Sequence, residues 1–340
     1  MKRKIKKIVN ITLAGVMALS LVGCGGSSSN DTTTTQTTTE ATTQTTTQTT
    51  TQAQASAEKE YSTEFVLKVI DHMREEGYED IVLDEVPQNV VCLSTAPVLA
   101  LYEMGANVIM APSTTVIDYP ADLGAEIITA ITSDKFDLEY IIAAEPDLIF
   151  IPASGYAQYG ELLESAGIPC HIVAGAYDDL DQYDIIKQET QVFTDAFIVD
   201  AETEKKAEAV MQRFVDLEKK IEEAKPLLKD KVYLSTMISG GTSFFVQQET
   251  STLGSVMKRL ELVNAYTPIM GESMAPVDLE HLVDIDLDVM IFVSATMDPE
   301  ITKQTAIDAM ANQQEVWDSI SAITDGHVLY LTTNYWSFGG

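Results

Sequence analysis

The chain has 340 residues and a formal net charge of −31, from 21 basic and 52 acidic side chains. This acidity argues against binding to nucleic acid or to an anionic membrane surface, and it disfavours free anionic ligands unless cations gather locally. Three cysteines are too few for a disulfide framework, so a globular part must be held together by its apolar core.

The first 24 residues are organised as an export signal. Cations at residues 2–7 precede an apolar stretch, residues 8–21, that is shorter than the roughly 20 residues a membrane-spanning helix needs. The stretch ends in Leu21-Val22-Gly23-Cys24, which resembles the lipobox of bacterial lipoproteins. The resemblance implies removal of residues 1–23 and a lipid on Cys24, the one covalent group that we expect. An ordinary signal peptide with an incidental cysteine is the simpler alternative.

Residues 24–57 are predicted to form a disordered tether. After Cys24 they are almost entirely Thr, Gln, Ser, Gly and Ala, which cannot bury enough apolar surface to offset the entropy of ordering. Fully extended, the segment would reach on the order of 100 Å, at about 3.3–3.6 Å per residue. Such a reach suggests a cell wall, and hence a protein that is lipid-anchored on the extracellular face of a Gram-positive cell membrane.

After the tether, residues 61–76 have the spacing of an amphipathic helix. Phe65, Val69 and Met73 recur every four residues and would share one face. We therefore assign residues 58–86 to an N-terminal extension built on this helix.

A long helix is predicted to join two lobes. Apolar residues recur at alternating spacings of three and four from Ala207 to Leu228, and Asp200 can cap the start of the helix. We place lobe 1 at residues 87–199, the interlobe helix at 200–228 and lobe 2 at 229–340. A coiled coil is the alternative, but folded lobes on both sides favour an intramolecular spacer. Because one helix makes a stiff spacer, we expect little lobe movement on ligand binding.

Within the lobes, short β-rich apolar runs alternate with helical segments such as 96–104 and 138–144. Strands are expected at residues 90–93, 108–111, 148–152, 171–173, 232–235, 289–293 and 328–331, with a Gly-Gly turn and an apolar run at 240–246. Runs that are apolar on both faces predict parallel sheets covered on both sides. The fold class is therefore α/β, with two similar lobes that each contain a mostly parallel sheet covered by helices.

An internal repeat supports the two-lobed reading. The strand motif VCLST at residues 91–95 is echoed by VYLST at 232–236, and the motif Asp-Leu-Glu ending at Glu139 is echoed by the same motif ending at Glu280. In each case the two copies are 141 positions apart. In both copies an aspartate opens the next strand eight residues after the glutamate.

The chain from about residue 87 resembles the Fe/B12-type substrate-binding proteins of ABC importers, which carry ferric siderophores, haem and cobalamin. The motifs that carry this resemblance are PQNVVCLSTAPVLALYEMGA at 87–106, DYP at 118–120, DLEYIIAAEPDLIFI at 137–151, AGIP at 166–169 and WDSISAITDGHVLYLTTNYW at 317–336. The resemblance implies a helical-backbone binding-protein fold and a monomer that passes a small-molecule metal chelate to an ABC permease dimer. Two departures are a helix where the family has a strand pair, and an end at Gly340 where members run on into a final helix.

The family's fold places the ligand between the lobes. In open α/β lobes, ligands bind outside the carboxyl ends of the strands. The cleft residues predicted from these ends are Ser94, Thr95, Tyr119, Tyr156, Tyr159, Tyr177, Met237, Tyr266, Met270, Tyr335 and Trp336. The strand-end segments contain no Arg and no Lys, which a multiply charged tri-catecholate complex would need. Aromatic and thioether side chains favour haem, a corrinoid or a neutral hydroxamate complex, although each one singly could serve packing.

No resident metal site is expected. The four histidines, His72, His171, His281 and His327, are scattered over different segments and do not suggest convergent zinc or manganese ligands. A bound haem would then need a Tyr or Met axial ligand.

Glu139 and Glu280 occupy matching positions at the starts of matching helices. The family resemblance implies that each docks onto arginines of the permease dimer. The simpler alternative is that each carboxylate only stabilises its helix, by about 0.3–1 kcal/mol.

A binding protein without catalytic residues is the leading interpretation. A chelatase-like enzyme that handles a tetrapyrrole would need a His–Glu pair in the cleft, and no nucleophile elbow, P-loop or metal triad is present in the sequence. A surface adhesin or spacer is a third possibility, motivated by the Thr-rich segment.

Cys92 and Cys170 are not expected to form a disulfide. The topology that the family implies puts their strands on either side of the strand at 148–152. Two strand spacings separate the Cα atoms by about 9–10 Å, beyond the roughly 7 Å that a disulfide can bridge.

Overall fold

The computed structural model describes residues 60–114, 117–129, 136–175, 180–240, 243–247, 249–266, 274–277 and 282–332. The signal, Cys24 and the tether lie outside the described residues, as do Tyr177, Met270, Tyr335, Trp336 and Glu280. Among the described residues, no helix is long and apolar enough to cross a membrane.

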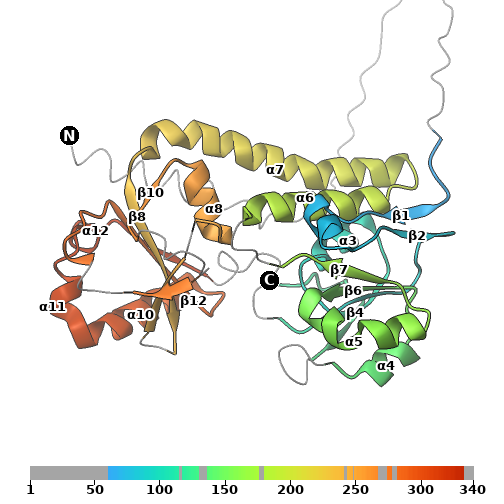
Figure 1. The fold of residues 1–340 in the computed structure, drawn as a ribbon. Coiled ribbons are helices and arrows are strands. Elements are labelled where there is room, and N and C mark those ends of the chain that lie inside the picture. Colours follow the sequence, from blue (N-terminus) through green and yellow to red (C-terminus); the bar gives the residue numbers. More distant parts are fainter. Residues whose placement is uncertain are drawn as a thin grey trace, which may run out of the picture.

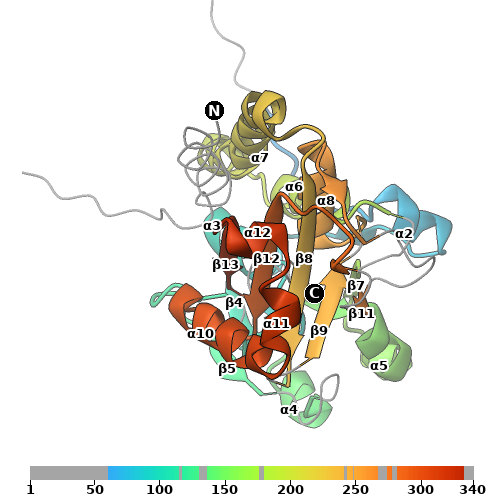
Figure 2. The ribbon, with the colours of Figure 1, turned by 90° about the vertical axis from the view of Figure 1, so that its left-hand side faces the viewer.

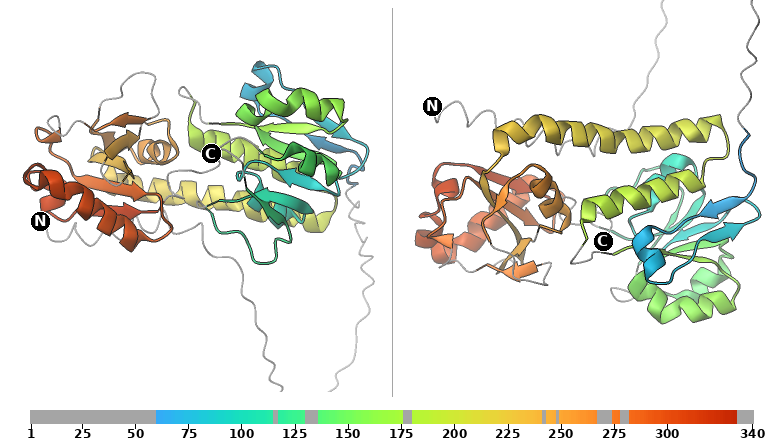
Figure 3. Two further views of the ribbon diagram at one scale, coloured as in Figure 1. Left: turned by 90° about the horizontal axis from the view of Figure 1, so that it is seen from below. Right: turned by 45° about the horizontal axis from the view of Figure 1, so that its top comes forward.

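Two α/β lobes are joined by one long helix, α7 (Ala201–Leu228), which runs along both of them (Figure 1; Figure 3). This is the interlobe helix at its predicted bounds. The carboxylate of Asp200 accepts the backbone N–H groups of Glu202 and Thr203, and the Thr203 hydroxyl accepts the N–H of Asp200. This capping box fixes the start of the helix.

Lobe 1 contains a five-stranded, fully parallel sheet in the order β5-β4-β3-β6-β7. The strands are β3 (Val90–Cys92), β4 (Val108–Pro112), β5 (Glu126–Ile128), β6 (Leu148–Pro152) and β7 (Cys170–Val173). One face packs against α3 (Val98–Met104), α6 (Gln182–Ala196) and α7; the other packs against α4 (Leu138–Ala143) and α5 (Ala153–Ser165). Both faces of the central strands are therefore buried, as predicted.

Lobe 2 has a mixed sheet in the order β11-β9-β8-β12-β13, and the short strand β10 also pairs with β8. The strands are β8 (Val232–Ser239), β9 (Ser243–Gln247), β10 (Val263–Asn264), β11 (Met274–Pro276), β12 (Val289–Ser294) and β13 (Val328–Leu331). β10 and β12 run parallel to β8, and β13 runs parallel to β12. β9 is antiparallel to β8, and β11 is antiparallel to β9, so β9 alone runs against the direction of the other described strands. The predicted Gly-Gly turn is the start of the β8–β9 hairpin, where Gly240 has a φ of 59° that favours glycine.

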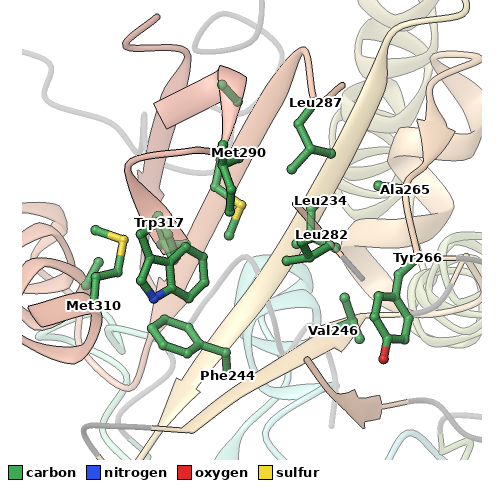
Figure 4. Close-up of a cluster of buried hydrophobic side chains, with 14 of the residues drawn as sticks. Leu234, Phe244, Val246, Ala265, Tyr266, Leu282, Leu287, Met290, Met310 and Trp317 are labelled. Carbon is green, nitrogen blue, oxygen red and sulfur yellow. The ribbon is translucent and has the colours of Figure 1, made fainter. Parts of the chain in front are cut away.

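The core of lobe 2 surrounds Trp317, which is fully buried against Phe244 and Phe292 (Figure 4). The helices that cover the Trp317 face of the sheet are α10 (Pro299–Met310), α11 (Gln314–Trp317) and α12 (Ser321–Thr324), seen in front of the sheet in Figure 2. The opposite face packs against the end of α7 and against α8 (Thr252–Arg259). The C-terminal half of α7 thus belongs to the core of lobe 2.

The structure keeps the 141-residue offset for the strands β6 and β12 but not for the strands β3 and β8, which carry the VCLST and VYLST motifs. Leu148 pairs with Val90 in lobe 1, whereas Val289, 141 positions on, pairs with Tyr233, which is 143 positions on from Val90. The VCLST and VYLST motifs are therefore two residues out of structural register. A shift of two keeps the same side-chain faces, but it moves Ser235 into the buried interior of β8.

Asp147 and Asp288, the repeated aspartates, perform the same task in each lobe. The carboxylate of Asp147 accepts the N–H of Asn89 at 2.9 Å, and that of Asp288 accepts the N–H of Val232 at 3.0 Å. Each aspartate ties the start of one strand to its neighbour, which explains why the motif recurs.

The prediction of a helix over residues 61–76 is wrong. Phe65, Leu67 and Val69 are buried in alternation, as in a strand, and β1 (Phe65–Leu67) pairs antiparallel with β2 (Ile81–Leu83). Only α2 (Asp71–Glu75) is helical. The strand pair usual in the family is thus present, and the spacing of four also fits every second residue of a strand. Ahead of β1, the Tyr61 hydroxyl donates to Glu204 of α7 at 2.8 Å.

The predicted separation of Cys92 and Cys170 is confirmed. Their strands, β3 and β7, lie on either side of β6, and both thiols are free. Cys92 packs into the cluster on the α3 side of the sheet, and Cys170 packs on the α5 side. The two thiols therefore point to opposite faces as well. Burial raises the pKa of the Cys170 thiol to about 12.

Candidate functional site

The carboxyl ends of the lobe 1 strands lie on the side of lobe 2. The chain runs from the end of β7 to the start of α6, where the Gln182 N–H donates to the Thr250 carbonyl of lobe 2 at 3.2 Å. Because the lobe 1 strands are parallel, their carboxyl ends share this edge. Ser94 and Thr95 come after β3, separated from it by Leu93, and lie at this edge as predicted. Ser94 is largely buried, and its hydroxyl accepts the Ala96 N–H.

Two of the predicted tyrosines are engaged within the fold. The Tyr119 hydroxyl donates to the Pro112 carbonyl at 2.9 Å, and burial raises its pKa. Tyr266 is 9% exposed in the lobe 2 core (Figure 4), and its hydroxyl donates to the Pro276 carbonyl at 3.2 Å. Each tyrosine holds a loop against the last residue of a strand, β4 or β11. We therefore assign them to positioning the strand-end loops.

Tyr156 lies along its own helix, α5. Its ring covers Gly160, where a Cβ atom would come within 2.7 Å of the ring, and its hydroxyl donates to Glu164. This hydrogen bond raises the pKa of Tyr156 to about 12. The side chain thus runs away from the end of β6, and it also contacts Tyr78 edge to face. Tyr156 joins the N-terminal extension to lobe 1 and does not point toward the strand ends.

Tyr159 and Met237 are both partly buried. Tyr159 packs against the cluster on the α5 face of lobe 1. Met237 lies in β8 between Val293 of β12 and Phe245 of β9. Of the described candidates, Ser94 and Thr95 lie at the strand ends, and Tyr159 and Met237 pack near the sheets. The described residues therefore do not form one dense aromatic cluster.

The arginines within the described residues are all engaged with carboxylates. Arg74 pairs with Asp80 at 2.7 Å, and Arg213 forms two bonds to Glu103, at 2.8 and 2.6 Å. Neither reaches the strand ends. A ligand bound there would meet neither of these two guanidinium groups.

Arg259 forms a brace between the lobes that the sequence did not indicate. From α8 of lobe 2, its guanidinium donates to Asp181 at 2.5 Å and to Asp184 at 2.6 Å, and it lies 4.5 Å from the centre of the Tyr183 ring. Asp181 also caps α6 by accepting the Tyr183 N–H. The start of α6 is therefore fixed to lobe 2, next to the end of β7.

The described histidines are not arranged as metal ligands. His171 is buried between Phe150 and Phe193, and burial lowers its pKa to about 4. His72 pairs with Glu76 on α2. Within the described part of the chain, no three His, Cys, Asp or Glu side chains are grouped so as to hold a metal ion.

Glu189 is a buried carboxylate that the sequence analysis missed. It lies on the α6 face that carries Ile185 and Phe193, and it accepts the N–H of Ala174, just past the end of β7, at 2.6 Å. Burial raises its pKa from 4.5 to about 8, opposed by the Ala174 hydrogen bond. The one available signal was a charge in an otherwise apolar helix face.

Replacing Glu189 by Gln is expected to stabilise the protein in a pH-dependent way. The folded-state pKa is raised, so the protonated form favours folding and this contribution is lost as pH rises from about 4.5 to about 8. Glutamine does not titrate and still accepts the Ala174 N–H. Urea unfolding should show equal stability near pH 4 and an advantage on the order of a few kcal/mol for Glu189→Gln at pH 8, from about 1.4 kcal/mol per pKa unit. An equal difference in stability between the parent and Glu189→Gln at both pH values would contradict a raised pKa for Glu189.

Glu139 is exposed on the first turn of α4 but is not its cap. Asp137 caps the helix by accepting the Tyr140 N–H at 3.2 Å. Asp137 therefore makes the capping hydrogen bond, and the simpler explanation of Glu139 is reduced to the stabilisation of about 0.3–1 kcal/mol that a carboxylate in the first turn of a helix supplies. Glu280 lies outside the described residues.

With both lobes in place, the chain can be compared with known proteins. The sequence profile of a family described as periplasmic binding protein matches residues 90–335, across both lobes and α7. The chain belongs to the periplasmic binding protein family. This confirms the resemblance that the motifs indicated. No curated protein matches the chain.

Three solved binding proteins share the fold of this chain. PiuA of Streptococcus pneumoniae, an iron uptake ABC transporter substrate-binding protein, is 18% identical with a TM-score of 0.63, covering 82% of this chain and 94% of its own. FhuD of Vibrio cholerae, a siderophore-binding protein with bound Fe3+–Desferal, is 18% identical with a TM-score of 0.56, covering 74% and 92%. HutB of Vibrio cholerae, a haem-binding protein, is 15% identical with a TM-score of 0.56, covering 74% and 92%.

Proposed function

We propose that this chain is an extracytoplasmic substrate-binding lipoprotein that captures an iron complex, haem or a corrinoid between its lobes and delivers it to an ABC permease dimer. The observation that carries the binding role is the family match across both lobes and the interlobe helix. The protein would act as a monomer and as a carrier, without chemical conversion of its ligand.

The electrostatics favour a ligand with little net negative charge. Arg74, Arg213 and Arg259 are all held by carboxylates, and the chain is strongly acidic. A multiply anionic ligand would be repelled in the absence of compensating cations. Haem with a Tyr or Met axial ligand, a corrinoid or a neutral hydroxamate complex fits these conditions better. The aromatic and Met residues Tyr177, Met270, Tyr335 and Trp336 remain candidate ligand contacts from segments outside the described residues.

The lipobox-like motif supports anchoring through Cys24 on the outer face of the cell membrane. A long predicted tether suits a Gram-positive envelope, and the similarity to a Streptococcus pneumoniae importer component agrees with it. The lipid on Cys24 would be the only contact with the membrane itself. Glu139 and Glu280 would meet the permease, one from each lobe.

A ligand panel tests this proposal directly. The protein from residue 58 onward is titrated with haem, cobalamin, ferric desferrioxamine and a ferric tri-catecholate, and the absorbance is followed. We expect one of the first three to bind with a Kd of about 1 μM or tighter, and the tri-catecholate to bind at least about tenfold more weakly. Failure of all four to bind would favour the adhesin or spacer alternative, and release of metal from a tetrapyrrole would favour the chelatase-like enzyme.

A further inference from the structure

A shallow hollow lies on the surface of lobe 1 beside Glu139. It forms where the edge strand β5 meets the first turn of α4, and its volume is about 230 Å3. Its lining includes Glu126, Ile127, Ile128, Phe136, Asp137 and Tyr140. Pockets for small-molecule ligands usually occupy roughly 300–1,000 Å3. This hollow is too small for a macrocycle or a metal chelate, and it suits a single protein side chain.

Two large side chains at the hollow remain exposed to solvent. The exposed fraction is 48% for Ile127 and 47% for Tyr140. The Tyr140 hydroxyl donates to both carboxylate oxygens of Glu126 at 2.8 Å, which fixes its ring against β5. The hollow is therefore formed before any partner arrives, and little side-chain entropy is left to lose on binding.

Negatively charged side chains lie beside the apolar side chains of this hollow. Glu126 and Asp137 belong to its lining, and Glu139 is the exposed neighbour of Tyr140 on α4. None of the residues that line it is basic. A complementary partner surface would present an apolar side chain with positive charge close by.

We propose that this hollow is a second anchoring point for the permease: it receives an apolar side chain from the basic segment that pairs with Glu139. The inference rests on the proposed docking role of Glu139 and adds a specificity pocket to it. The charges speed association and set orientation, whereas the buried apolar side chain slows dissociation.

Photo-crosslinking in cells tests the proposal with the full-length chain. A photoreactive phenylalanine analogue at position 127 should link to a polytopic membrane subunit, through a peptide that carries Lys or Arg beside an apolar residue. The matched control is position 215, because Val215 is 52% exposed on α7, on the other face of lobe 1. It should give no such product.

The outcomes separate this inference from the proposed function. A product between position 127 and a second copy of this chain would overturn the hollow as a permease site. So would no product at 127 while position 143 links to the permease, which would leave the docking role intact; Ala143 is exposed on α4 one turn after Glu139, so a probe there keeps the glutamate. If neither 127 nor 143 links to a membrane subunit, the docking function itself fails.

A charge substitution gives an independent readout. Ile127→Arg fills the hollow with a cation and should lower the crosslink yield from position 143 about tenfold or more, as expected for the loss of an apolar anchor. Val215→Arg should leave that yield unchanged, and both variants should bind ligand as the parent does. An unchanged yield in Ile127→Arg, with ligand binding intact, would contradict the proposal.

Discussion

Replacement of both Glu139 and Glu280 by Ala should nearly abolish delivery of ligand to the permease while leaving ligand affinity in solution within about twofold. Glu139 is exposed on the face of lobe 1 covered by α4, and Asp137 already caps that helix. The sequence predicts the same position for Glu280 in lobe 2, so the loss of both carboxylates should lower the free energy of unfolding by at most about 1–2 kcal/mol.

Uptake, or ATP hydrolysis stimulated by the binding protein, should fall more than tenfold, because rim charges that face arginines set association and register. The matched control is Glu208→Ala with Glu223→Ala, which removes two exposed glutamates from α7 with the same change in net charge. This control should transport normally. A Glu139/Glu280 variant that loses ligand affinity tenfold but still supports transport would place the glutamates in the ligand site.

Arg259→Ala should loosen the arrangement of the two lobes. Besides α7, the parent protein joins its lobes through the Arg259 brace and the hydrogen bond from the Gln182 N–H to the Thr250 carbonyl, so its radius of gyration should hardly change when ligand is added. Loss of two charge-assisted hydrogen bonds should lower the free energy of unfolding by about 1.5–3 kcal/mol. Solution scattering should then show a larger ligand-free particle that contracts on ligand binding.

Arg213→Ala is the matched control for this experiment. Arg213 also forms two hydrogen bonds to a carboxylate, but it joins α7 to α3 of lobe 1 and its side chain is 55% exposed. We expect at most about 1 kcal/mol of destabilisation and no change in scattering. For Arg259→Lys, the free energy of unfolding and the radius of gyration without ligand should lie between those of the parent and of Arg259→Ala, because lysine keeps the charge but cannot reach both aspartates. An Arg259→Ala protein with unchanged scattering would show that α7 alone sets the lobe arrangement.

The sequence predicted the regular elements of the lobes well because their apolar periods are unambiguous. α7 has seven apolar positions at helical spacing and a capping aspartate, and the buried strand β6 and the partly buried strand β13 have the predicted bounds. The N-terminal extension failed because a spacing of four fits a helix and also every second residue of a strand. The short pair β1 and β2 lacked the length that decides between the two periods.

The candidate site was predictable in place but not in detail. The strand-end rule located Ser94 and Thr95, but it carries no information on side-chain direction, so it did not foresee that Tyr156 lies back along α5. The Arg259 brace joins residues 75 and 78 positions apart in the chain. No local pattern encodes such a pairing, and only the packing of α6 against α8 creates it.

The contact between Tyr61 and Glu204 has a consequence for how the protein meets the membrane. It places the root of the predicted tether beside α7, whereas α4 and Glu139 lie across the sheet on the opposite side of lobe 1 (Figure 1). Three layers of helix, sheet and helix measure on the order of 30 Å. If Glu139 faces the bilayer as proposed, a tether of the predicted kind would have to pass around the whole thickness of the lobe, and its length would have to cover this detour before any remainder could span a cell wall.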